Sequence, residues 1–127
     1  MKALRKTKRL GLTSLIPKDR LQNFSISNIV FEVAPKINAA GRISHGKEAV
    51  KLLISNCVYN AQEIVENIIE LNNERREKDS YTTESALKQI QEFDSSDKHC
   101  IVVYDPAWHK GVIGIVASRL VENYYRP

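Results

Sequence analysis

The longest regular pattern of apolar positions begins after residue 60 and has the period of an α-helix. Residues 60–63 (NAQE) fit a capping box, with Asn60 as the cap and the Glu63 carboxylate three residues later. No Gly or Pro occurs from residue 61 to residue 94. Two apolar stripes follow helical spacing within this region: Ala61, Ile64, Val65, Ile68 and Leu71, then Ala86, Leu87, Ile90 and Phe93.

The segment between the two stripes, residues 72–80 (NNERREKDS), is polar on every side. A helix that is polar all round cannot be packed in a core, so a single helix would bridge two bodies through solvent, as a rod of roughly 50 Å. The alternative is two helices joined by a turn near residues 79–83, where Asp79-Ser80 and Thr82-Thr83 are poor helix formers. We favour the single helix. In either case each stripe needs its own packing partner.

The N-terminal part of the chain predicts short elements. Residues 3–16 indicate a basic helix that is broken near Gly11 and ended by Pro17. Asp19 and Ser25 offer N-caps for weak helical turns. We therefore expect only local helical structure before the next apolar run.

Two further segments precede the long helix. Residues 29–33 (IVFEV) form a short β-branched run that Pro35 limits. After Gly46 the apolar positions return at helical spacing until about Ser55. These positions are Ala49, Val50, Leu52 and Leu53.

The pattern changes period near the C-terminus. Residues 100–104 (CIVVY) form a continuous β-branched run, typical of a strand that is buried on both faces of a parallel sheet, and Asp105-Pro106 ends it. Apolar positions at helical spacing then predict a helix that ends near Arg126-Pro127: Val112, Ile113, Val116, Leu120, Val121 and Tyr124. A strand, a short loop and a helix make the first half of a βαβ unit. A lone strand cannot satisfy its backbone groups, so we expect a domain that continues beyond this chain.

Charge is concentrated at one end of the 127 residues. Residues 1–20 hold seven bases and one acid, a net +6, so the remaining 12 bases and 14 acids give −2 and the whole chain +4. Such a block attracts polyanions through counterion release. A solvated helix face or a segment resembling a transit peptide is the alternative.

No uncharged apolar run approaches the roughly 20 residues that span a bilayer, so we exclude an integral membrane protein. The basic N-terminus lacks the apolar stretch of a secretory signal. Cys57 and Cys100 lack paired-ligand spacing, so we expect two reduced thiols in a cytoplasmic protein, both buried as small hydrophobic side chains.

The first segment with candidate chemistry is residues 34–46. Gly41 can adopt positive φ and lets a ligand approach the backbone, Asn38 supplies a donor and an acceptor, and Arg42 offers a planar fork that suits phosphate. Alternatively, Asn38 caps a helical turn and Arg42 pairs with an internal carboxylate. The residues alone leave these two interpretations open.

The second segment follows the predicted strand, where open α/β sheets bind ligands. Trp108 could stack on a base, His109 could donate to a phosphate oxygen or relay a proton, and Lys110 and Gly111 open a helix whose N-terminus attracts anions. Alternatively, Trp108 belongs to the core, His109 is its hydrogen-bonded neighbour, and the glycines serve helix–sheet contact only. We place the ligand interpretation ahead because of the strand end.

We expect no metal site and no complete catalytic set in this chain. The histidines His45, His99 and His109 have no His or Cys partner at metal-ligand spacing. No Asp-x-Asp or Asp-His-His cluster, phosphate loop or serine-nucleophile elbow is present.

Both candidate segments resemble the RecJ family of single-strand-specific DNA exonucleases, within the DHH phosphoesterase superfamily. Residues 35–42 (PKINAAGR) look like that family's P-[RK]-[IL]-N-A-A-G-R element. Residues 108–120 (WHKGVIGIVASRL) look like its W-H-x-G-V-I-G-I-V-A-S-R-L signature. The similarity runs across nearly the whole chain, and the second motif is long enough to be strongly specific.

The resemblance implies a fragment of a 5′→3′ exonuclease that degrades single-stranded DNA in recombination and repair, by hydrolysis dependent on Mn²⁺ or Mg²⁺. It implies an α/β fold, mostly helical as given: residues 1–46 as the tail of the DHH domain, 47–97 as a helical connector, and 98–127 as the truncated start of the DHH-associated domain. By analogy, Asn38 and Arg42 would contact DNA phosphate, and His109 with its neighbours would face the DNA cleft.

The family's DHH motif and its G-S-G-R-S element are absent from these residues, so we expect an internal fragment whose metal ligands lie outside the chain and which is inactive alone. Alternatives are a DHH-family fragment acting on oligoribonucleotides or cyclic dinucleotides, and a non-enzymatic basic module that binds nucleic acid. Apolar stripes left uncovered would also favour self-association.

Overall fold

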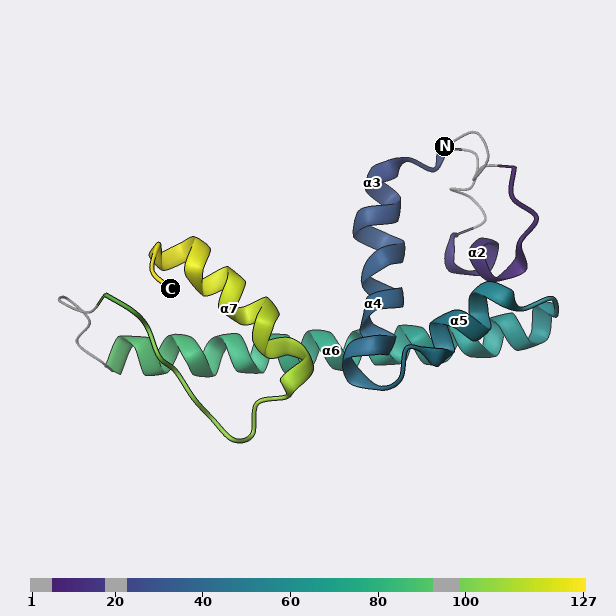
Figure 1. Cartoon of the computed structure of the whole chain (residues 1–127). Helices are drawn as coiled ribbons and strands as arrows, with labels where there is room; N and C mark the ends of the chain where they lie inside the picture. The colour runs from purple at the N-terminus through teal and green to yellow at the C-terminus, as the bar shows by residue number, and fades with distance from the viewer. Residues whose placement is uncertain (1–5, 18–22, 93–98) are drawn as a thin grey trace. The chain divides into compact units, whose positions relative to one another are not determined.

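The computed structural model describes residues 6–17, 23–92 and 99–127, which divide into two compact units, Met1–Asn73 and Glu74–Pro127. Figure 1 labels the helices. They are α2 (Leu10–Leu15), α3 (Ile26–Asn28), α4 (Ala34–Ile43), α5 (Lys47–Ile54), α6 (Val58–Glu92) and α7 (Lys110–Tyr124), with the π-helix η2 (Ile29–Val33) between α3 and α4. These residues are mostly helical and include no assigned strand, so the α/β class expected from the sequence is not seen in them.

The first helix is shorter than predicted. Residues 6–9 are not helical, α2 begins at Leu10, and residues 3–5 of the predicted helix lie outside the described residues, as does the predicted cap Asp19. Gly11 lies inside α2 and does not break it. A Cβ at Gly11 would overlap the Leu52 carbonyl oxygen, so the glycine allows α2 to pack directly on the backbone of α5.

A continuous run of helical turns leads from Ser25 into α4. The predicted cap is confirmed: the Asn28 N–H donates to Ser25 Oγ at 3.3 Å, and the Ser25 N–H donates to Asn28 Oδ1 at 2.9 Å. Residues 29–33 then form a π-turn, in which the Ala34 N–H donates to the Ile29 carbonyl. The expectation that Pro35 limits this run is wrong. Proline lacks an N–H and clashes with the carbonyl four residues earlier, and a wide turn before it relieves that conflict.

The core of the first unit gathers apolar side chains from α2, η2, α4, α5 and α6 and from the segments between them. Leu52 of α5 and Ile68 of α6 are fully buried at its centre, as the predicted helical stripes require. The buried members of this cluster are Leu15, Ile16, Phe24, Val33, Ala40, Ala49, Leu52, Ala61, Val65 and Ile68.

The long polar segment belongs to one helix, α6, so the single-helix prediction is confirmed and the two-helix alternative is wrong (Figure 1). The helix begins earlier than predicted, because the Ala61 N–H donates to the Cys57 carbonyl at 3.0 Å. Asn60 therefore lies in the first turn of α6 instead of capping it, and the predicted capping box does not form.

The prediction that solvent surrounds the polar segment on every side is wrong. Asn72 is 5% exposed in the first unit and Asp79 is 9% exposed in the second. Asp79 is buried because it forms an ion pair with Arg119 of α7. A polar helix face can thus be packed where a partner supplies the matching charge. Of the second predicted stripe, Ala86 and Ile90 are buried, and Phe93 lies outside the described residues.

The predicted strand at residues 100–104 is extended without being a strand, and it is not buried on both faces. Val102 and Tyr104 are 80% and 74% exposed, whereas Ile101 and Val103 pack against a core formed by Ala86, Ile90, Val116 and Leu120. A strand assignment requires a paired neighbour, and the part of the chain that the structure describes supplies none.

The C-terminal helix agrees with the prediction. α7 begins at Lys110 and ends at Tyr124, after which Tyr125 adopts φ 53°. Its buried residues, Val112, Val116 and Leu120, are four apart and form one face. This face packs α7 into the second unit's core.

Candidate functional site

The three candidate residues of the first unit lie on one face of α4. Asn38, Gly41 and Arg42 have the spacing i, i+3 and i+4, and all three are exposed. Ala39 and Ala40 lie on the opposite face and are fully buried. The structure therefore brings the three candidates together on a surface that faces solvent.

Asn38 and Gly41 correct two details of the sequence interpretation. Asn38 lies inside α4, so the alternative that it caps a helical turn is wrong. Gly41 does not adopt positive φ, and a Cβ placed on it would meet nothing within 4 Å. Since helix interiors disfavour glycine by about 1 kcal/mol relative to alanine, this glycine is not explained by packing among the described residues. It leaves the α4 face without a side chain beside Asn38.

The candidates of the second unit lie at a tight turn and the helix start that follows it. Asp105 shapes the turn: its Oδ1 accepts from the Ala107 N–H at 2.8 Å, and its carbonyl accepts from the Trp108 N–H at 3.1 Å. His109 is the N-cap of α7, and its Nδ1 accepts from the Gly111 N–H at 3.1 Å. Because Nδ1 accepts, neutral His109 carries its ring proton on Nε2, where it is a donor.

Trp108 and Lys110, the residues on either side of His109, differ in burial. Trp108 packs against the second unit's core and its Nε1 is buried with no hydrogen-bond partner, so the core interpretation of Trp108 holds in the structure. Lys110, the first residue of α7, is exposed. Gly114 is also exposed and a Cβ there would meet nothing within 4 Å, so its predicted contact with a sheet is not found.

A groove of about 270 Å³ lies beside His109 in the second unit. Its walls come from one turn of α6 and from the turn before α7: Glu77, Lys78, Tyr81, Thr82, Ala107 and His109. Sequence reasoning missed the α6 residues, because the polar segment was interpreted as solvated on every side. The signal that could have found them is the spacing of Lys78 and Tyr81, which puts a cation and an aromatic ring on one helix face.

A second feature that the sequence did not indicate is the contact that joins α6 to α7. Arg119 donates to Asp79 through two nitrogens, at 3.1 and 3.2 Å, and to Thr83 Oγ1 at 2.7 Å. Arg75 Nη1 lies 3.7 Å from Asp79 Oδ2, which also accepts from Arg119. This ion pair joins the second half of α7 to α6 within the second unit.

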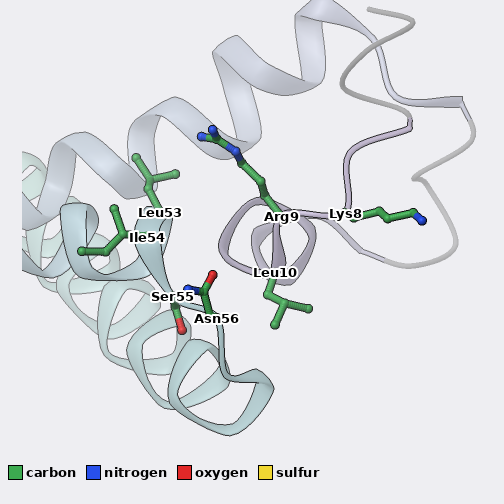
Figure 2. Close-up of a pocket in the computed structure, with 7 residues that line it drawn as sticks. All are labelled: Lys8, Arg9, Leu10, Leu53, Ile54, Ser55 and Asn56. Carbon is green, nitrogen blue, oxygen red and sulfur yellow. The ribbon is translucent and has the colours of Figure 1, made fainter.

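The described part of the basic N-terminal block lines a separate groove in the first unit, of about 520 Å³. Figure 2 shows that Lys8 and Arg9 extend in different directions from this groove, away from Ser55 and Asn56. The two cations thus do not converge on one anion position. Lys6 is exposed and does not line the groove, and Lys2, Arg5, Lys18 and Arg20 lie outside the described residues.

Neither a metal centre nor a membrane span is found in the residues described. Among them, no three His, Cys, Asp or Glu side chains gather into a group that could hold a metal ion. Within the same residues, no helix has both the length and the apolar character needed to cross a bilayer. Cys57 and Cys100 are exposed free thiols, which corrects any expectation of two buried cysteines.

Comparison with known proteins identifies relatives of a single kind. No family model matches the chain. The single-stranded-DNA-specific exonuclease RecJ of Bacillus subtilis is 38% identical over 129 residues, which cover 100% of this chain and 16% of that protein. The protein of the same name from Haemophilus influenzae is 34% identical and covers 94% of this chain and 22% of its own length.

Solved structures give the same result. The crystal structure of Thermus thermophilus RecJ in complex with Mn²⁺ matches with a TM-score of 0.81 and 28% identity, over 99% of this chain and 19% of that one. The structure of the same protein with Mg²⁺ also has a TM-score of 0.81. The chain thus spans about a fifth of the length of the proteins it matches. Over one segment of their length, the chain resembles the single-stranded-DNA-specific exonucleases named RecJ in both sequence and structure.

Proposed function

We propose that this chain contributes DNA-contacting surface to a longer enzyme that degrades single-stranded DNA from its 5′ end. Its relatives carry the name single-stranded-DNA-specific exonuclease, which supports the substrate and the reaction class. The observation that carries the proposal is the α4 face, where Asn38 and Arg42 flank Gly41 and the open space over it. A glycine that no internal contact requires suits a surface that a ligand backbone approaches closely.

Each residue of the α4 face has a distinct role in this proposal. The Arg42 guanidinium binds a phosphate of the strand through paired N–H donors. The Asn38 amide donates to a neighbouring phosphate oxygen. Gly41 allows the sugar–phosphate backbone to lie against α4 between them. Contacts of this kind position a strand without reading its sequence, as expected of a general exonuclease.

The second unit contributes the turn before α7. His109 donates from Nε2 to a phosphate oxygen, while its Nδ1 remains bonded to the Gly111 N–H. Lys110 adds a positive charge beside the helix N-terminus, where the dipole already favours an anion. Trp108 supports the turn from the core side.

The hydrolytic step belongs to residues outside this chain. Structures of the Thermus relative hold Mn²⁺ and Mg²⁺, and those ions in the parent enzyme would supply the Lewis acidity and activated water that phosphodiester hydrolysis requires. The described residues offer no donor set that fits such ions, so we assign no catalytic residue here and expect the isolated chain to be inactive.

The proposal extends to domain organisation and biological role. Residues 1–46 correspond to the end of the metal-binding domain, 47–97 to the connector and 98–127 to the start of the second domain, with the α/β character of that domain completed by later residues. The parent enzyme would act in DNA recombination and repair in the cytoplasm.

Binding of short single strands tests this proposal. We would measure the fluorescence anisotropy of labelled oligo-dT of about 12 nucleotides with a 5′-phosphate or a 5′-hydroxyl, using the 127-residue chain. Arg42→Ala should weaken binding of the phosphorylated strand by about tenfold, and of the hydroxyl strand by less, because a charge-assisted pair to the terminal phosphate is lost.

The matched control is Lys51→Ala. Lys51 is an exposed cation of α5 that pairs with Glu48 at 2.7 Å, so its loss removes the same charge elsewhere in the unit. Equal losses for Arg42→Ala and Lys51→Ala, or equal losses for both strand ends, would reject the role of Arg42 in phosphate binding.

A further inference from the structure

The groove beside His109 has the composition of a nucleotide site. Its α6 wall presents a cation, Lys78, and an aromatic ring, Tyr81, about one turn apart, together with the buried Thr82. Pockets for small organic ligands span about 300–1,000 Å³, and this groove of about 270 Å³ lies just below that range, so it suits one unit of a longer strand, with part of that unit left in solvent.

Tyr81 is available for stacking. It is 57% exposed, although aromatic rings of this size are commonly buried in a core or an interface. It lines the groove together with His109, so a base lying on the ring would have its phosphate within the part of the groove that His109 and Lys78 border.

The charges of the groove are asymmetric. Lys78 Nζ lies 3.3 Å from Glu74 Oε1, and its side chain is 36% exposed, so its ammonium is held near the rim without being buried. Glu77 also lines the groove and repels a phosphate. Its carboxylate can instead accept a hydrogen bond from an N–H of a base, such as the N3–H of thymine. The base is therefore expected toward Glu77 and Tyr81, and the phosphate toward His109 and Lys78.

We propose that this groove is a nucleotide subsite in which Tyr81 stacks on a base of single-stranded DNA and Lys78 pairs with its phosphate. The inference rests on the proposed function, since it takes the same substrate class. It adds two α6 residues and a base-contacting position to a surface that otherwise holds only phosphate. Stacking on an aromatic ring is tolerant of sequence, as a strand-degrading enzyme needs.

The test compares Tyr81→Ala with a matched tyrosine on the same helix. Tyr59 is 75% exposed in the first unit and lines no groove that includes His109, so Tyr59→Ala is the control. Binding of labelled oligo-dT by the 127-residue chain would be measured by anisotropy, with quenching of Trp108, the chain's single tryptophan, as a second readout beside the groove.

We expect Tyr81→Ala to weaken binding by about fivefold to tenfold, Tyr81→Phe to retain it, and Tyr59→Ala to leave it unchanged. On an abasic strand of equal length and charge, Tyr81→Ala and the unsubstituted chain should bind equally, because no base remains to stack. Lys78→Gln should weaken binding of both strands and lower the slope of affinity against salt concentration by about one ion.

The outcomes separate this subsite from the proposed function. If Arg42→Ala weakens binding while Tyr81→Ala does not, or if Tyr81→Ala weakens the abasic strand equally, the subsite is wrong and the proposed function stands. If the unsubstituted chain, with its helical circular dichroism intact, binds neither strand, both are wrong. Tyr81 and Lys78 are on the surface, so folding of each variant is checked directly by its thermal melt.

Discussion

The side-chain amide of Gln89 makes both hydrogen bonds with the backbone of Tyr104. Gln89 Nε2 donates to the Tyr104 carbonyl at 3.0 Å, and the Tyr104 N–H donates to Gln89 Oε1 at 3.1 Å. A helix side chain thus takes the place of a neighbouring strand for one residue of the extended segment. The adjacent Ile101 N–H is satisfied separately, by the Pro127 carbonyl at 2.9 Å.

This relationship predicts the effect of removing the Gln89 amide. Gln89→Ala should lower the free energy of unfolding by about 1 kcal/mol, because two exposed backbone groups return to solvent. Gln91→Ala, an exposed position two residues along α6, should change it by less. Chemical denaturation monitored by Trp108 fluorescence measures both. Equal destabilisation by the two variants would show that helix propensity, and not the Tyr104 contact, is the cause.

The Asp79–Arg119 ion pair predicts a larger effect. Asp79→Asn should destabilise the second unit by about 2–3 kcal/mol, because Arg119 and Arg75 would then face a neutral group at a mostly buried position. A double-mutant cycle with Arg119→Gln measures the coupling. Glu84→Gln is the control, since the Glu84–Lys88 pair is fully exposed.

High salt tests the Asp79–Arg119 pair a second time, with the Glu84–Lys88 pair again as the control. In the control pair, the hydrogen bond and the charge of Lys88 lower the pKa of Glu84. The control pair therefore forms only above the pH at which Glu84 ionises and is lost on acidification. As an exposed pair it should be screened by salt. The Asp79 effect should persist in high salt, and its disappearance there would contradict burial of this carboxylate.

The close contact of α2 with α5 predicts that Gly11 is required. Gly11→Ala should destabilise the first unit by at least about 1–3 kcal/mol, because the new methyl group meets the Leu52 carbonyl and forces the helices apart. Gly114→Ala is the matched control. Its methyl group meets open space within α7, so we expect unchanged or slightly increased stability in a thermal melt. Tolerance of Gly11→Ala would contradict the packing of α2 on α5.

Gly41 predicts opposite effects on stability and on binding. Gly41→Ala should raise the free energy of unfolding by up to about 1 kcal/mol, because α4 gains a better helix former with no clash. The same methyl group should weaken binding of single-stranded DNA, since it occupies the surface between Asn38 and Arg42. Thermal melts and anisotropy on one preparation measure both. A variant that is more stable and binds equally well would exclude close approach of the strand at this point.

The helices could largely be predicted from sequence because their apolar spacing is a local signal. The absence of Gly and Pro after residue 61 predicted α6, and the spacing of Val112, Val116 and Leu120 predicted α7. Other features depend on distant contacts. Pro35 led us to predict a boundary after residues 29–33. The structure has a wide turn there instead, and such a turn has no simple sequence pattern that could have predicted it. Residues 101–104 suggested a strand, because β-branched runs do not reveal whether the partner is another strand or Gln89.

The residues of the candidate site also differ in whether a local sequence signal could identify them. Asn38, Gly41 and Arg42 could be selected from their chemistry, and their shared face follows once α4 is known to be helical. The spacing of Lys78 and Tyr81 could have shown that they share a helix face, but it could not show the groove, because the groove joins them to a turn more than 20 residues later in the chain. Asp79 was interpreted as a solvated charge because its partner, Arg119, lies 40 residues away.

The wide turn at residues 29–33 sets the rotational phase of everything that follows it in α4. An α-helix advances about 100° per residue, so one residue more or fewer before Pro35 would swing the helix by that angle about its axis. Ala39 and Ala40 are themselves about 100° apart around the helix, so a rotation of that size would move one of them out of the core. The length of a single turn therefore decides which side of α4 meets the solvent, independently of the side chains on that surface.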